Sequence, residues 1–149
     1  MIHILTEPFD PWQVLADYQK THIDGKHSYG ATGVFVGTMR DFNDAHGVQQ
    51  MELSHYPGMT EKQTEKIINR ITDEWDVLDV LVCHRVGVLL PSDPIVMVAV
   101  WSHHRVDAFE VSRAVMEKLK SEAPFWKKEV RDNSDKHWVE KNTAGYKGV

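Results

Sequence analysis

Seven consecutive apolar residues, Ile95 to Trp101, constrain the fold of this chain more than any other feature. The run is far too short to span a bilayer. It also lacks the alternation of polar and apolar residues that marks a strand with one face in water. The run therefore predicts a central strand that is covered on both faces.

Turn residues and apolar spacing predict the elements around this strand. Further strands are expected at 2–5, 31–39, 48–56, 77–85 and 86–90, with a closing hairpin of 125–130 and 137–139. Helices are expected after an Asp10–Pro11 cap, from a capping box of Thr60 and Gln63, and over 106–122, where Pro124 ends the last one. The order, roughly β-α-β-β-α-β-β-α-β-β, predicts an α+β domain with a mostly antiparallel sheet and about three helices.

Hydrophobic spacing also predicts which side chains are buried. The expected core residues are Trp12, Ile67, Ile68, Ile71, Trp75, Trp101, Phe109, Val115, Met116 and Leu119. Gly33 and Gly37 interrupt a predicted strand, which is typical of a bulge or of a close approach between backbones.

The composition fits a single domain over 1–149, with a polar tail from about 141. Hydrophobic residues make up 42% and charged residues 26% of the 149, which is ordinary for a soluble globular protein. The formal net charge of −5 argues against nucleic acid or an anionic membrane as a partner. Cys83 is the single cysteine, so no intrachain disulfide is possible, and the N-terminus lacks a signal-peptide pattern. We therefore expect a cytoplasmic protein.

Two lysines that flank a bend are the strongest candidates for chemistry. Lys120 lies near the end of the last predicted helix and Lys127 follows Pro124, with Phe125 and Trp126 between them. Lysines that face one pocket depress each other's pKa, which suits an anionic substrate and proton transfer near neutral pH. The alternative for each is a solvated surface lysine, which is the commoner situation.

Three further candidates lie where predicted strands end. Arg40 is in a strand-end loop, where binding residues are common, although an ion pair with Asp41 or Asp44 would explain it equally well. His104 and Arg105 open the last helix, whose free backbone N–H groups favour anions. A helix cap or a core histidine is the alternative for His104.

No motif indicates a metal site or another catalytic class. The histidines and Cys83 lack the short, paired spacing of zinc ligands, so neither a metal nor another cofactor is expected. The sequence contains no Gly-x-Ser-x-Gly elbow and no Gly-x-x-x-x-Gly-Lys-[Ser/Thr] loop. It therefore predicts neither a serine hydrolase nor a P-loop nucleotide enzyme.

Four stretches share their order and spacing with one known family. They are Leu-Lys-Ser-Glu-Ala-Pro-Phe-Trp-Lys-Lys-Glu at 119–129, Gly-Thr-Met-Arg-Asp-Phe-Asn at 37–43, Leu-Ser-His-Tyr-Pro-Gly-Met-Thr at 53–60, and Ser-His-His-Arg at 102–105 followed by Ala-Phe-Glu at 108–110. A closing Trp-Val-Glu at 138–140 fits as well. Over about 33–140 the chain resembles the MoaE family, the large catalytic subunit of molybdopterin synthase.

The resemblance implies a sulfurtransferase of molybdenum cofactor biosynthesis. The family makes the dithiolene of molybdopterin from cyclic pyranopterin monophosphate. The sulfur arrives as a thiocarboxylate on the C-terminal Gly-Gly of a small ubiquitin-like subunit. A homodimer of the large subunit carries one small subunit at each end, which gives a heterotetramer.

The resemblance also implies the site residues. Lys120 and Lys127 would be catalytic, and the substrate would contact Thr38, Met39, Arg40, His104, Arg105, Lys120, Lys127, Lys128 and Glu129. Some family members carry a lysine where this chain has Thr38, so Thr38 and Met39 are expected to contribute through their backbone.

Two other functions are open at this point. A non-catalytic protein could dock the ubiquitin-like partner, and its binding would survive Lys120→Ala. A phosphate- or nucleotide-binding regulator could use the same basic cluster and would bind generic nucleotides. Docking alone needs no lysine pair around a proline bend, and no nucleotide motif supports a regulator, so the synthase is the preferred function.

Overall fold

Two β-sheets and three α-helices form the fold, and the computed structural model describes residues 1–25, 28–43, 46–131 and 136–139. The larger sheet has the strand order β1 (Ile2–Leu5), β5 (Val77–Arg85), β7 (Pro94–Ser102) and β2 (Ala31–Thr38). β1 pairs with β5 in parallel, whereas β5–β7 and β7–β2 are antiparallel. The predicted α+β class with a mostly antiparallel sheet is confirmed.

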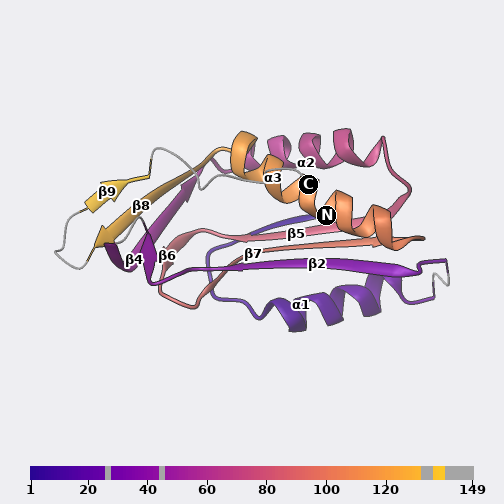
Figure 1. Cartoon of the computed structure of the whole chain (residues 1–149), viewed down its shortest axis with the longest axis horizontal. Coiled ribbons are helices and arrows are strands. Elements are labelled where there is room, and N and C mark those ends of the chain that lie inside the picture. The colour runs from indigo at the N-terminus through magenta and orange to yellow at the C-terminus, as the bar shows by residue number, and fades with distance from the viewer. Residues whose placement is uncertain (26–27, 44–45, 132–135, 140–149) are drawn as a thin grey trace.

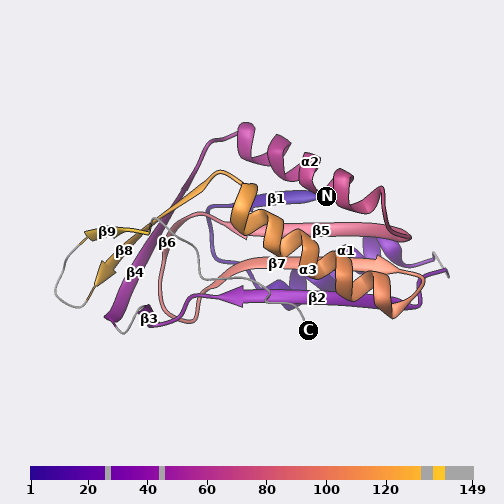
Figure 2. The same ribbon diagram turned by 45° about the horizontal axis from the view of Figure 1, so that its top comes forward.

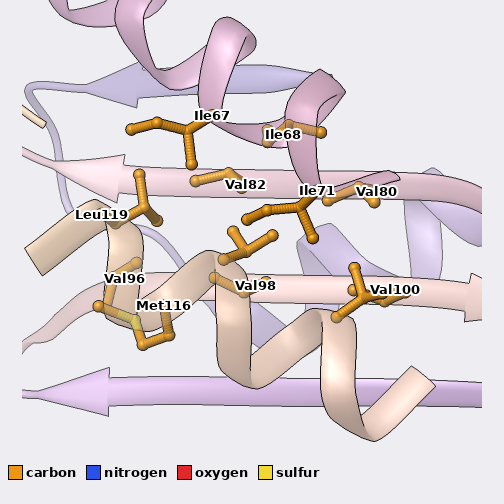
Figure 3. Packing of buried hydrophobic residues seen from close by; sticks show 12 residues of the cluster. Ile67, Ile68, Ile71, Val80, Val82, Val96, Val98, Val100, Met116 and Leu119 are labelled. Carbon is orange, nitrogen blue, oxygen red and sulfur yellow. The ribbon is translucent and has the colours of Figure 1, made fainter. Parts of the chain in front are cut away.

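Helices cover both faces of the larger sheet (Figures 1 and 2). α2 (Met59–Thr72) and α3 (Arg105–Glu122) lie on one face, and α1 (Pro11–Tyr18), which continues as a π-helical turn (Gln19–Ile23), lies on the other. This arrangement explains why β7 has no polar alternation. Val96, Val98 and Val100 face α2 and α3 (Figure 3), while the intervening Met97, Ala99 and Trp101 face α1.

The smaller sheet lies beyond one end of the larger one (Figure 2). Its strand order is β3 (Phe42–Asn43), β4 (His46–His55), β8 (Phe125–Arg131) and β9 (Lys136–Trp138), and β6 (Gly87–Leu89) also pairs with β4. The predicted C-terminal hairpin is therefore present as β8 and β9. A third cluster of buried residues, which includes Met39, Met51 and Leu53, packs beneath this sheet.

The two strand glycines have the physical roles that their position indicated. A Cβ atom on Gly33 would lie 2.5 Å from the carbonyl oxygen of Ala108, so only glycine lets α3 approach β2 this closely. At Gly37 the pairing between β2 and β7 changes register, so β2 bulges just before its end at Thr38.

Three sequence predictions about local structure are wrong. Trp12 and Phe109 are 63% and 67% exposed, so neither is a core residue. Thr60 is not a helix cap either, because α2 begins at Met59 after Gly58, and the Glu61 carboxylate accepts a hydrogen bond from the Gly58 N–H at 2.7 Å.

Among the described residues, no helix combines the length and apolar character needed to cross a membrane. The predicted polar tail from about 141 lies outside the described residues.

Candidate active site

The bend between α3 and β8 brings Lys120 and Lys127 close together. α3 ends at Glu122 and β8 begins at Phe125, so only two residues separate the helix from the strand. Thr60 holds this bend because its hydroxyl donates to the Pro124 carbonyl at 3.4 Å and accepts from the Tyr56 N–H at 3.1 Å. The position of the bend thus depends on the N-terminus of α2, which the sequence pattern did not reveal.

Lys127 is the more enclosed of the two lysines. Lys120 is exposed, whereas Lys127 is half-buried. Burial lowers the pKa of Lys127, and the positive charge of Lys120 lowers it further, while Glu129 acts in the opposite direction. Lys120 is therefore close enough to lower the pKa of Lys127.

Strand alternation decides which neighbours share the face of Lys127. Its partner across the sheet is Leu53, and Glu129 is two residues further along the same face. Glu129 is buried at 6% exposure and Leu53 at 2%. Lys128 belongs to the opposite face, where its Nζ lies 5.4 Å from the ring centroid of Trp138. The structure therefore separates the side chain of Lys128 from that of Lys127.

A buried histidine that the sequence did not single out supports this face. His84 is the last residue but one of β5, and its ring stacks on Phe125 with centroids 3.9 Å apart and planes 12° apart. Its Nδ1 lies 3.0 Å from the carbonyl oxygen of Arg85, and a carbonyl can only accept, so Nδ1 carries the proton. Burial lowers the pKa of His84 to about 4, with smaller contributions from Lys127 and His55. The ring is therefore neutral at pH 7.

The loop after β2 lies at the same end of the molecule as the lysines (Figure 2). Thr38 and Arg40 are exposed, but the Met39 side chain is packed into the core beneath the smaller sheet. The backbone of Met39 donates to the Asp93 carbonyl and accepts from the Ser92 N–H, both at 2.9 Å. Any contact of Met39 with a ligand must therefore use its backbone.

An ion pair between a buried arginine and a partly exposed aspartate holds this loop in place. Arg85 contacts Asp93 at 2.8 Å and donates to the Val88 carbonyl at 3.1 Å. Only 8% of the Arg85 side chain is exposed, and Ser92 beside Asp93 has a positive φ of 74°. Arg85 thereby fixes the turn that contains Ser92 and Asp93. The backbone of Met39, just before Arg40, is hydrogen-bonded to this turn.

His104 and Arg105 lie at the other end of α3. Fifteen residues of helix separate Arg105 from Lys120, which corresponds to about 22 Å along the axis. Within one chain, the two groups therefore do not line the same small pocket. Both side chains are exposed, so the core alternative for His104 is wrong. His104 does occupy the N-cap position of α3, although its side chain makes no cap hydrogen bond.

No metal-binding cluster of three or more His, Cys, Asp or Glu side chains occurs within the described part of the chain. Cys83 is buried in the core under α1, as expected. Burial raises the pKa of its thiol to about 11, so it is an inert, protonated core residue.

Comparison with known proteins identifies the family. A family model described as "MoaE protein" matches residues 4–122, most of the chain. The chain belongs to the MoaE family. The predicted family is thereby confirmed.

Related proteins align with this chain over most of their own length. A molybdopterin synthase catalytic subunit from Haemophilus influenzae is 44% identical, over 93% of this chain and 89% of that protein. One from Ralstonia nicotianae is 55% identical, over 70% of this chain and 60% of that protein. The enzyme class predicted from the sequence, a molybdopterin synthase catalytic subunit, is confirmed by these relatives.

Solved structures share the fold as well. A MoaE protein from Burkholderia ambifaria is 46% identical with a TM-score of 0.76, over 93% of this chain and 88% of that one. The crystal structure of molybdopterin synthase from Staphylococcus aureus matches with a TM-score of 0.81 at 30% identity, over 93% of this chain and 96% of that one.

Proposed function

We propose that this MoaE-family subunit transfers sulfur from a carrier thiocarboxylate to cyclic pyranopterin monophosphate at the Lys120–Lys127 pair. The observation that carries this proposal is the enclosed position of Lys127 beside a second lysine. Burial and a neighbouring positive charge lower the pKa of Lys127, so its amine exchanges a proton more readily than an ordinary lysine, which suits proton transfer. An exposed ammonium at Lys120 can bind the anionic thiocarboxylate. It can also stabilise the negative charge that develops as the thiocarboxylate sulfur attacks.

The neighbours of the pair suit an anionic substrate. Arg40 lies in the loop at the same end of the molecule and offers permanently charged donors to a phosphate. Backbone groups of Thr38 and Met39 lie beside it. Glu129 favours the charged form of Lys127 and limits how far the pKa of that amine is lowered. Lys128, on the other face of β8, contributes to the surrounding positive field.

The positions of His104 and Arg105 favour a site that is completed by a second copy. Two α3 helices packed antiparallel across a two-fold axis would bring Arg105 of one protomer to Lys120 of the other. The axis would cross α3 midway, near Ser112 and Arg113. A groove lies there, lined by Gly33, Val34, Phe35, Phe109, Ser112, Arg113, Met116 and Glu117.

The exposed apolar side chains at this groove support the homodimer. Phe109 is 67% exposed and Phe35 is 40% exposed, and both would be buried by such packing. We therefore propose that His104 and Arg105 bind the substrate phosphate in the pocket of the partner protomer. The mispredicted burial of Phe109 has the same explanation, since its apolar surface is suited to an interface.

The sulfur donor in this proposal is a small ubiquitin-like subunit with a C-terminal Gly-Gly thiocarboxylate. A solved structure with the same fold, 22% identical, is a protein–protein complex of subunits 1 and 2 of a molybdopterin-converting factor from Helicobacter pylori. The side chain of Cys83 is buried, so this chain offers no exposed thiol as a donor. A thiocarboxylate requires a reducing compartment, and we place the reaction in the cytoplasm.

Turnover with single-lysine variants tests this function. The purified chain is mixed with a thiocarboxylated carrier and cyclic pyranopterin monophosphate, and the dithiolene product is measured. Lys120→Ala and Lys127→Ala should each abolish product. Lys118→Ala is the matched control, because Lys118 is an exposed α3 lysine that pairs with Glu122 at 2.8 Å, and it should retain activity.

Two results would replace the proposal. A wild-type chain that binds the carrier but forms no product would be a docking protein. A chain that binds nucleotides equally well without any carrier would be a phosphate-binding regulator.

A further inference from the structure

A short segment before β2 holds the residues that lead from β7 into α3. The Gly30 N–H donates to the Ser102 carbonyl at 2.9 Å. Nδ1 of His103 lies 2.6 Å from the Ser28 carbonyl, and a carbonyl can only accept, so Nδ1 carries the proton and donates. Ser28, Gly30 and His103 thus form a clamp. It lies where β7 ends and β2 begins, at the end of the larger sheet away from the smaller one (Figure 1).

The backbone of three consecutive residues before α3 is fixed around this clamp. A Cβ atom on Gly30 would overlap the carbonyl oxygen of His103, so the two backbones approach as closely as only glycine permits. The Ser102 hydroxyl donates to the His104 carbonyl at 2.7 Å. The neighbouring Tyr29 packs against the core under α1, so the clamp is anchored to the interior. The direction in which the chain enters α3 is therefore set by this segment.

We propose that His103 is a positioning residue for the substrate phosphate, an inference that rests on the proposed function. His104 and Arg105 follow His103 directly at the start of α3, and both are exposed. To bind a phosphate in the pocket of the partner protomer, they need a direction that their own chain fixes. A group that is misplaced by about 1 Å loses much of its effect on a bound substrate. The hydrogen bond from His103 to Ser28 supplies this constraint at the residue next to the pair.

The two neighbouring histidines have different environments. The His103 ring is partly buried and donates to the backbone of a distant segment, whereas the His104 side chain is exposed. The backbone of His104 is extended, with φ −127° and ψ 150°. Adjacent side chains of an extended chain point in opposite directions. One histidine can therefore face the substrate while the other faces its own protein.

A charge pair is the weaker explanation for the position of His103. Its Nε2 lies 3.8 Å from the carboxylate of Asp76, whose side chain is 69% exposed. Exposed pairs of this kind contribute little to stability. The contact with Ser28 is shorter, and its acceptor belongs to the backbone, so it holds the ring in one place. The hydrogen bond, and not the charge pair, carries the assignment.

Steady-state turnover with a saturating thiocarboxylated carrier tests the role of His103. His103→Leu should raise KM for cyclic pyranopterin monophosphate by about tenfold, the effect of roughly one hydrogen bond, and leave kcat within about twofold of the wild type. Asparagine places an amide N–H close to the position of Nδ1, so His103→Asn should bring KM most of the way back. A merely structural role would give no such split between KM and kcat. His3→Leu is the matched control, because His3 is exposed on β1, and it should keep the wild-type KM.

Gly30→Ala is a second perturbation, which leaves the His103 ring intact. Its new Cβ would displace the His103 carbonyl, so it should raise KM as well, and thermal unfolding checks that each variant folds. A wild-type KM in both His103→Leu and Gly30→Ala, beside a raised KM in Arg105→Ala, would overturn the clamp alone. An effect of Asp76→Asn as large as that of His103→Leu would overturn the hydrogen bond as the cause. If Arg105→Ala leaves KM unchanged, the proposed phosphate site fails instead.

Discussion

The buried His84 makes a quantitative prediction about acid stability. Its pKa is lowered from 6.5 to about 4, first by burial and then by Lys127 and His55, against a raising effect of its hydrogen bond to Arg85. The unfolded chain therefore takes up a proton near pH 6.5, whereas the folded chain does so only near pH 4. The stability that His84 contributes is fully present above pH 6.5 and is lost as the pH falls towards 4.

The magnitude follows from the size of this shift. One pH unit corresponds to about 1.4 kcal/mol, so His84 alone should remove about 3 kcal/mol of unfolding free energy between pH 7.5 and pH 4. His84→Asn keeps a donor near the Arg85 carbonyl but cannot titrate. The variant will be less stable at pH 7.5, because it loses the stacking on Phe125, but its stability should fall less steeply with acid.

Urea unfolding at half-unit pH steps would measure both proteins. The difference in unfolding free energy between wild type and variant should shrink by about 3 kcal/mol as the pH falls from 7.5 to 4. A difference that stays constant over this range would mean that His84 titrates normally in the folded protein. The argument from burial would then be wrong.

Three further predictions concern the supports of the site. Gly33→Ala should destabilise the protein by about 1–3 kcal/mol in thermal unfolding, because the new Cβ would lie 2.5 Å from a backbone oxygen of α3. An unchanged Tm would contradict the close approach of α3 to β2. Asp93→Asn should cost about 3 kcal/mol in urea unfolding, because it removes the charge partner of the buried Arg85, and a loss below about 1 kcal/mol would show that the pair is solvated. Lys127→Met should abolish turnover yet raise the free energy of unfolding at pH 7, because burial disfavours the charged amine. This gain in stability should decline as the pH rises towards 10.5, and a destabilised variant would refute the argument.

Sequence reasoning predicted those features of the candidate site that depend on chain neighbours. Lys120 and Lys127 were predictable because a proline bend between two lysines is a local pattern. His84 and Thr60 were not, because their roles depend on partners distant in sequence: Phe125 for His84 and Pro124 for Thr60. No local signal distinguishes such residues from ordinary strand and helix-start residues.

The exposed Phe109 shows a second limit. Helical spacing predicts which residues share one face, and Phe109 does lie on the same side of α3 as Met116. Helical spacing cannot predict how much of that face the neighbouring elements cover. Met116 is covered and Phe109 is not, and the same apolar surface then becomes available to a second protein chain.

The sequence by itself determined the element types, the two-sided burial of β7 and the lysine pair. Each of these depends on residues that are close along the chain, where spacing and side-chain chemistry suffice. Only the tertiary structure decided that the loop carrying Arg40 lies at the same end of the molecule as the lysines, that Lys128 faces away from Lys127, and that Arg105 is about 22 Å from Lys120. The physical reason is that the direction of a helix and the pleat of a strand fix which side chains meet, and neither is set until the sheets pack.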